Sequence, residues 1–209
     1  MADHLEFISK LKFSILNKNL PGEKAHLEMA PYRISTIEAK KRNKNPRLSA
    51  VGIHLFINSK NKLSTILIQR TNKLPTHKGQ IAFPGGKKEK DDIDLIETAK
   101  RESYEELGIE NGVLIGPLTP VYIPVSNFDV SPFVFFHTKY PNIVQCQDEV
   151  DHYFDIEIEN VLNPKNIHSF DYKENNGINI KNIPCFEINN KIIWGATALI
   201  LNELKHILS

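Results

Sequence analysis

The sequence lacks the features that several classes of protein require. Its two cysteines, Cys146 and Cys185, show no Cys-x-x-Cys spacing, which excludes a disulfide framework and a cysteine-based zinc site. No stretch approaches the roughly 20 apolar residues of a membrane span, and the first residues carry acids where a signal peptide needs bases. The 26 Lys and Arg residues nearly balance the 25 Asp and Glu residues, so no excess charge favours nucleic acid or a membrane surface. We therefore expect a cytoplasmic protein with neither of these partners.

The length and composition fit one domain with an extension. A sequence of 209 residues that is 41% hydrophobic and 24% charged is typical of a globular protein. Residues 4–17 have apolar side chains at helical spacing, and Pro21-Gly22 follows them. A second, short helix is expected near residues 35–41. We predict that residues 1–44 form a helical arm packed on a domain over residues 45–209.

From residue 47 onward, branched and aromatic residues form short runs separated by turn signals. Strands are expected over 49–58, 63–70, 111–123, 132–138, 150–158 and 182–193, and helices over 92–107 and 196–208. Asn and Lys dominate residues 159–181, which predicts a long surface loop. The irregular alternation of strands and helices favours an α/β sandwich with a mixed sheet.

The segment from Gly85 to Ile109 contains a cluster of carboxylates. On a helix with about 100° per residue, Glu102, Glu105 and Glu106 share one exposed side. The opposite, apolar side is expected to hold Ile93, Ile96, Ala99, Ser103, Tyr104 and Leu107. Each pair of like charges three or four residues apart destabilises a helix by about a few tenths of a kcal/mol. The cluster makes sense around a hard divalent cation, although taken alone it also fits an acidic face in solvent.

The end of this segment resembles a known motif. Residues 101–109, Arg-Glu-Ser-Tyr-Glu-Glu-Leu-Gly-Ile, resemble the second half of the Nudix box, with Ser103 where an aliphatic residue is usual. In the first half, Asp92 occupies the position of the upstream glutamate, and Arg101 comes one residue late. The resemblance implies a Nudix-type α/β/α sandwich and a pyrophosphohydrolase that uses Mg²⁺ or Mn²⁺.

The extra residue before the helix resembles the coenzyme A pyrophosphatase branch of that family. The upstream signature of the branch matches at Arg70, at Gly79 and at Phe83-Pro-Gly-Gly, whereas Pro75 replaces its second arginine. The likeness continues at 122–128 and 193–197. It implies hydrolysis of coenzyme A or its thioesters to adenosine 3′,5′-bisphosphate and 4′-phosphopantetheine.

The resemblance also assigns roles to residues. Glu102 and Glu106 are expected to bind the metal, and Glu105 is either a third ligand or the general base. Arg101 is expected to orient a glutamate. Glu149 is expected to supply a late catalytic carboxylate, with a solvated strand end as the alternative. Contacts with the substrate are expected from Arg70, Lys73, Lys78, Gly85 and Gly86, although for the basic residues a solvated loop is the alternative.

Other functions stay open. ADP-ribose is a second candidate substrate, because a proline some fifteen residues after the box is associated with that branch and Pro124 lies there. A catalytically silent Nudix domain that binds a nucleotide or a protein partner is a third reading, which the intact glutamate set disfavours. The expected ligand in each case is a small nucleotide, and a homodimer is compatible with all of them.

Overall fold

The computed structural model describes residues 2–31, 38–39, 41, 45–71, 79–110, 112–173 and 179–209. Its helices are α1 (Ala2–Leu16), α2 (Glu23–Glu28), α4 (Leu95–Leu107), α5 (Ile158–Leu162), the 3-10 turn η1 (Pro164–Asn166) and α6 (Gly195–Leu208). Its strands are β1 (Arg47–Ile57), β2 (Leu63–Arg70), β3 (Ile81–Ala82), β4 (Gly85–Lys87), β5 (Val113–Pro117), β6 (Val121–Ile123), β7 (Phe128–Phe136), β8 (Val150–Glu157), β9 (Ile167–Lys173), β10 (Asn179–Ile188) and β11 (Lys191–Ile193). Most of the short helix predicted near 35–41 lies outside the described residues.

The main sheet is mixed, as predicted. Its central path runs β3-β2-β1-β7-β5, and β4, β6 and β8 pair with β1, β7 and β2 respectively. Strand β1 lies antiparallel to β2 and parallel to β7. A separate three-stranded sheet has the order β11-β10-β9.

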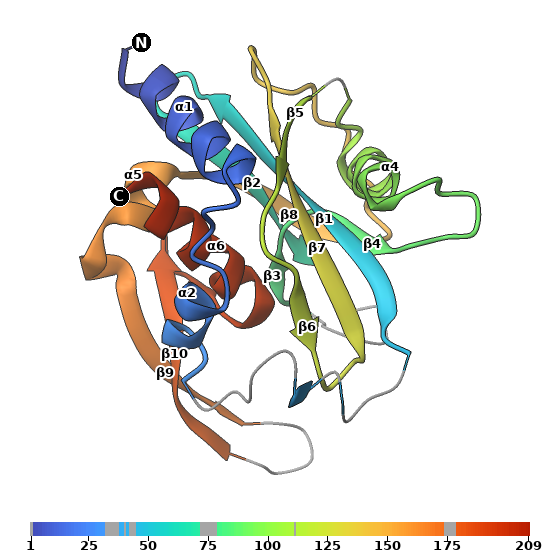
Figure 1. Cartoon of the computed structure of the whole chain (residues 1–209), viewed down its shortest axis with the longest axis vertical. Coiled ribbons are helices and arrows are strands. Elements are labelled where there is room, and N and C mark those ends of the chain that lie inside the picture. The colour runs from blue at the N-terminus through green and yellow to red at the C-terminus, as the bar shows by residue number, and fades with distance from the viewer. Residues whose placement is uncertain are drawn as a thin grey trace.

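Alternating side chains of β1 contact different layers. Ile53 and Leu55 join the core that contains α6, whereas Phe56 packs in a cluster with Leu107 of α4. Helix α4 accordingly covers one face of the main sheet, and α1 and α6 lie on the other (Figure 1). The three layers confirm the predicted α/β/α sandwich. No helix in the described ranges has the length and apolar character needed to cross a membrane.

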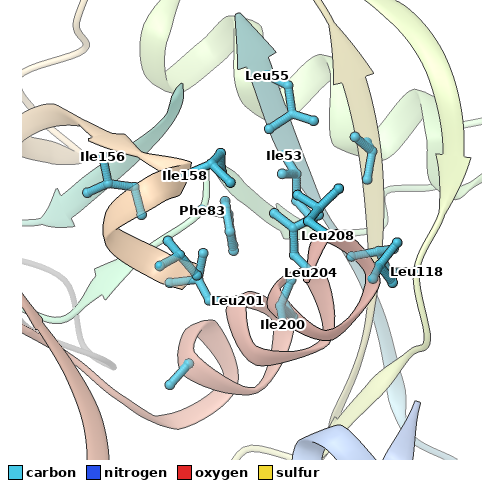
Figure 2. Packing of buried hydrophobic residues seen from close by; sticks show 14 of the residues in the cluster. Ile53, Leu55, Phe83, Leu118, Ile156, Ile158, Ile200, Leu201, Leu204 and Leu208 are labelled. Atoms are coloured by element: carbon cyan, nitrogen blue, oxygen red, sulfur yellow. The ribbon is translucent and has the colours of Figure 1, made fainter. Parts of the chain in front are cut away.

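The largest core joins distant parts of the chain. Leu11 of α1 and Met29 after α2 pack in one cluster with Phe83 and with Leu201 and Leu204 of α6. Figure 2 shows Phe83 in the cluster with Leu201 and Leu204. In the sequence, Phe83 directly precedes the Pro-Gly-Gly turn. The described part of the predicted arm therefore shares its core with the sheet, while the boundary between residues 44 and 45 stays a prediction.

A buried carboxylate also ties the arm to the rest of the fold. Glu203 of α6 is fully buried and accepts hydrogen bonds from the Gly22 backbone N–H at 3.2 Å and the Thr119 hydroxyl at 2.6 Å. Its other oxygen lies 3.3 Å from Nε2 of the buried His26. These contacts satisfy a group that would be costly to bury alone.

The strands predicted over 49–58, 63–70 and 150–158 and the last helix are confirmed. The segments predicted over 111–123 and 182–193 each form two strands, and the strand predicted over 132–138 begins earlier, at Phe128. The prediction for residues 159–181 is wrong. The predicted loop over 159–181 instead contains most of α5, the turn η1, strand β9 and the start of β10. Strand β9 is an edge strand, and most of its side chains are exposed or half-buried. Its polar composition therefore reflects its position at the sheet edge rather than an absence of regular structure.

Candidate active site

The Pro84-Gly85-Gly86 turn brings backbone close to α4. The Pro84 carbonyl accepts a hydrogen bond from the Gly52 N–H at 2.8 Å, and β4 then pairs with β1. Gly85 has φ of 157°, and a Cβ there would lie 2.4 Å from the Ala50 carbonyl oxygen. Only glycine fits this approach, and its N–H points to a carboxylate of α4.

Helix α4 begins later than predicted. Asp94 is its N-cap and accepts a hydrogen bond from the Glu97 N–H at 2.9 Å, and the helix ends at Gly108 with φ of 66°. Ile93 therefore precedes the helix and is 84% exposed, and Tyr104 is 56% exposed. Their placement on the buried side was wrong, because the face that meets the sheet is formed by Ala99, Ser103, Glu106 and Leu107 instead.

Glu106 is the most deeply buried of the three clustered glutamates. The prediction of an exposed position was wrong, since its side chain is 0% exposed. One oxygen accepts a hydrogen bond from Arg70 Nη1 at 2.8 Å, and the other accepts one from the Gly85 N–H at 2.9 Å. Burial raises the pKa of this carboxyl to about 8, although the Arg70 charge and the Gly85 hydrogen bond oppose the shift.

Arg101 organises the other carboxylates. Its guanidinium donates to Glu102 at 2.9 Å, to Glu105 at 2.7 Å and to the Lys87 carbonyl at 3.0 Å. This geometry agrees with the orienting role expected for Arg101. The hydrogen bonds that Arg101 donates to Asp92 and Glu102, and the charges of Glu102 and Glu105, raise the pKa of the guanidinium, which stays charged.

Asp92 is the residue whose role the sequence did not give. It accepts two bonds from Arg101, at 2.9 and 3.1 Å, and one from the Thr98 hydroxyl at 2.8 Å. The hydrogen bonds from Arg101 lower the pKa of its carboxyl. Asp92 therefore holds Arg101 in place. The position of Asp92 after Gly86, where the Nudix box has its upstream glutamate, was the feature of the sequence that could have indicated this role.

Glu102 and Glu149 complete the acidic region. Burial raises the pKa of Glu102, and the charges of Glu105 and Glu149 raise it further, against the effect of Arg101. The charge of Glu149 also acts on Glu106. Glu149 lies beside the end of β2, where its carbonyl accepts a hydrogen bond from the Thr71 N–H at 3.0 Å. The structure thus brings Glu149 into electrostatic reach of Glu102 and Glu106, while its catalytic role stays a prediction.

The side chains that could bind a metal in this region have the chemistry that a hard divalent cation requires. Arg101 pairs with Asp92, Arg70 pairs with Glu106, and the charges of Glu102 and Glu149 also act on Glu106. All the acceptors are carboxylate oxygens, which Mg²⁺ and Mn²⁺ prefer. Within the described ranges, however, no three Asp, Glu, His or Cys side chains already surround one point. Arginines hold three of these carboxylates by direct hydrogen bonds, Arg70 at Glu106 and Arg101 at Glu102 and Glu105.

Comparison with known proteins decides the family. A family model described as NUDIX domain matches residues 46–174. The chain belongs to the Nudix family. It is 35% identical over 141 residues to proteins described as uncharacterized Nudix hydrolase NudL from Yersinia pestis (strain Pestoides F) and Yersinia pseudotuberculosis (serotype O:1b), covering 66% of this chain and 69% of theirs. Nudix hydrolases act on nucleoside diphosphate derivatives and generally use divalent metals, so this protein is a pyrophosphohydrolase.

The fold agrees with this assignment. A crystal structure of a MutT/nudix family protein from Enterococcus faecalis superimposes with a TM-score of 0.53 over 87% of this chain and 71% of its own. The two sequences are 14% identical, so the likeness concerns the fold alone.

Two predicted substrate residues cannot be placed. Lys73 and Lys78 lie in the 72–78 segment, outside the residues that the structure describes. Their contact with substrate phosphates stays a prediction. Arg70 and Gly85 are placed, and both contact Glu106.

Gly86, a predicted substrate contact, lies against the Glu102 carboxylate, and this close approach can be tested. A Cβ at Gly86 would lie 2.4 Å from Glu102 Oε2, whereas a Cβ at Gly85 would meet backbone. We expect Gly86→Ala to displace the Glu102 carboxylate and to lower kcat/KM by about a hundredfold, as misplacement by about 1 Å can, while the protein stays folded. Gly85→Ala should instead lower the melting temperature strongly. Measuring kcat/KM and thermal unfolding for both variants tests this, and an active Gly86→Ala enzyme would contradict it.

Ser103, the departure from the Nudix box, has a buried partner. Its hydroxyl donates to the Ala99 carbonyl at 2.6 Å and lies 2.8 Å from His54 Nε2. The hydroxyl proton is thereby used, so His54 Nε2 must carry the hydrogen and donate to Ser103. His54 Nδ1 lies 2.9 Å from His137 Nε2 and accepts in turn. Burial, with the His137 charge, lowers the pKa of His54 to about 3, so His54 stays neutral.

The His54–Ser103 contact predicts an energetic coupling between β1 and α4. Ser103→Val would leave the buried His54 N–H without an acceptor, which costs about 1–3 kcal/mol. In a His54→Phe background the same substitution should cost at least about 1 kcal/mol less. Urea unfolding of the four proteins of this cycle measures the difference. Equal costs in both backgrounds would show that the hydrogen bond contributes no stability.

Proposed function

We propose that the protein hydrolyses the pyrophosphate bond of coenzyme A or its thioesters, with Mg²⁺ or Mn²⁺ as cofactor. The products would be adenosine 3′,5′-bisphosphate and 4′-phosphopantetheine. The observation that supports hydrolysis is the buried Glu106 beside Arg70 and the Gly85 N–H, in electrostatic reach of Glu102 and Glu149. Coenzyme A as the substrate rests on the resemblance at Arg70, Gly79 and the Phe83-Pro-Gly-Gly turn. The two cysteines are both free, which agrees with a cytoplasmic setting for the reaction.

Glu102, Glu105 and Glu106 would hold the cation. When bound, the cation would neutralise charge on the diphosphate and activate a water molecule for attack. The side chains differ in freedom, because both oxygens of Glu106 accept hydrogen bonds, whereas Glu105 is 49% exposed and pairs with Arg101. Glu106 is therefore the ligand that sets the position of the site.

Glu105 and Glu149 are the two candidates for the general base. Each carries a carboxylate that could accept the proton of the attacking water, and neither is as buried as Glu106. Arg101 would orient Glu102 and Glu105, because its Nη1 donates a hydrogen bond to each of them. Gly85 and Gly86 would allow a phosphate to approach the backbone closely.

ADP-ribose is the second candidate substrate. Pro124, which suggested it, follows β6, and its carbonyl accepts a hydrogen bond from the Asn127 N–H at 3.3 Å. That turn role accounts for the proline without a substrate, so the residue favours ADP-ribose less than the Phe83-Pro-Gly-Gly match favours coenzyme A.

A substrate panel tests the proposal. With Mg²⁺ or Mn²⁺, we expect the highest kcat/KM for coenzyme A among coenzyme A, dephospho-coenzyme A, ADP-ribose, NADH and dinucleoside polyphosphates. A charge-assisted contact with the ribose 3′-phosphate would favour coenzyme A over its dephospho form by roughly ten- to hundredfold. Arg70, Lys73 and Lys78 are the proposed sources of that contact, and Arg70→Ala should narrow the gap. Equal rates for the two forms would mean that the 3′-phosphate is not recognised.

A further inference from the structure

Within the acidic site, Arg70 is fixed at the end of β2 and holds the Glu106 carboxylate by a hydrogen bond. Arg70 ends β2, and its backbone is fixed by hydrogen bonds from its N–H to the Gln80 carbonyl at 3.0 Å and from the Gly79 N–H to its carbonyl at 3.1 Å. Its side chain, 21% exposed, reaches the fully buried Glu106 carboxylate with a 2.8 Å bond from Nη1. The guanidinium therefore lies between solvent and the carboxylate.

We propose that Arg70 is a positioning residue that holds Glu106 in the metal-free protein and competes with the divalent cation for this carboxylate. When the cation binds, Arg70 is repelled from Glu106 and its N–H donors become available for a substrate phosphate. The inference deepens the proposed function and rests on it in one respect, that Glu106 is a metal ligand. It does not depend on which nucleotide is hydrolysed.

The charges indicate that Arg70 competes with the cation for the Glu106 carboxylate rather than helping the cation to bind. A guanidinium and a divalent cation at the same carboxylate repel each other, and at a separation of about 5 Å near a protein surface this repulsion changes affinity by about tenfold or more. The carboxylate does not need Arg70 for its orientation alone, because the Gly85 N–H holds the other oxygen at 2.9 Å. Glu102 and Glu149 add negative charge that keeps Glu106 attractive to a cation after Arg70 has moved.

The donor geometry supports the second half of the proposal. Arginine has five N–H donors in a planar fork, and the bond to Glu106 uses one of them. The same fork matches the oxygens of a phosphate. One side chain can thus exchange the carboxylate for a substrate phosphate without a movement of β2.

The test measures binding of Mn²⁺ alone to the full chain without substrate. Arg70→Gln removes the charge but keeps a hydrogen-bond donor for Glu106, and Arg70→Lys keeps the charge. Lys100→Gln is the matched control, since Lys100 is an exposed cation on the same helix as Glu106. We expect Arg70→Gln to bind Mn²⁺ about tenfold more tightly than the wild type, and Arg70→Lys and Lys100→Gln to bind it with wild-type affinity.

Although Arg70→Gln should bind Mn²⁺ more tightly, its catalytic activity should fall. At saturating Mn²⁺, Arg70→Gln should have a lower kcat/KM than the wild type, because the substrate phosphate loses its partner, and Arg70→Lys should recover part of it. Thermal unfolding of each variant shows that the fold is kept. Unchanged or weaker Mn²⁺ binding by Arg70→Gln would overturn the competition, while leaving the proposed hydrolysis intact. Absence of Mn²⁺ binding in the wild type would overturn both.

Discussion

Replacing Glu106 by glutamine is expected to lower kcat/KM by at least about a hundredfold. Loss of a residue that only supports a metal ligand commonly costs about 10–100-fold, and Glu106 is proposed as a ligand itself. Its carboxylate is fully buried between Arg70 and the Gly85 N–H, so no neighbouring water or side chain can replace it. The measurement is kcat/KM at saturating Mg²⁺ and saturating Mn²⁺.

The fold should survive this substitution. The amide oxygen of glutamine can accept one of the two hydrogen bonds that Glu106 now accepts, and the substitution keeps the shape of the side chain. The melting temperature should therefore change much less than the activity. Glu110→Gln is the matched control, because Glu110 is an exposed carboxylate just beyond the same helix. Near-wild-type turnover of Glu106→Gln would refute the role of Glu106 in metal binding.

Removal of divalent cations by EDTA is expected to abolish turnover, and Mg²⁺ or Mn²⁺ should restore it. The carboxylates of Glu102, Glu105 and Glu149 would repel a negatively charged diphosphate, and a bound divalent cation would offset this repulsion. Ca²⁺ should restore less activity, because it is larger and holds its ligands less rigidly than Mg²⁺. Circular dichroism in EDTA provides the control for folding. Full activity in the chelator would require a different mechanism.

The dependence on Mg²⁺ should change with pH. Burial raises the pKa of Glu106 to about 8 in the metal-free protein, so below that pH the carboxyl is mostly protonated. A cation must then displace the proton before it can bind. The Mg²⁺ concentration that gives half-maximal activity should therefore rise as the pH is lowered from about 8.5 to about 6.5. A concentration that stays constant over this range would show that Glu106 does not exchange a proton for the metal.

The sequence predicted the helix that carries the carboxylates and the strands that support it, but not how deeply each carboxylate lies. Position on a helix defines which side chains share a face, and Glu102, Glu105 and Glu106 do lie along one side of α4. Their burial depends on what approaches that side, and the approach is made by Gly85 and Arg70 from strands earlier in the chain. No local pattern contains that information, so Glu106 was expected in solvent.

Two further features could not be predicted from the sequence for the same reason. Ser103 was visible as an exception to the motif, but its partner His54 lies 49 positions earlier and meets it only because β1 passes beneath α4. Residues 167–173 were expected to form a loop because their composition is polar. Strand β9 needs few apolar residues, since it pairs with β10 by backbone hydrogen bonds at the edge of its sheet.

The main core sets an order in which the site can be completed during synthesis. Phe83 precedes the Pro84-Gly85-Gly86 turn and lies in one core cluster with Leu201 and Leu204 of α6 (Figure 2). The Thr197 hydroxyl also donates a hydrogen bond to the Ile81 carbonyl at 2.9 Å. The ribosome makes β1, β4 and α4 well before it makes residues 195–208. Until α6 has emerged, the core cluster around Phe83 lacks its α6 side chains, and the Ile81 carbonyl lacks the hydrogen bond from Thr197. The carboxylates of α4 are thus made early, but the core next to the Pro84-Gly85-Gly86 turn is completed only late.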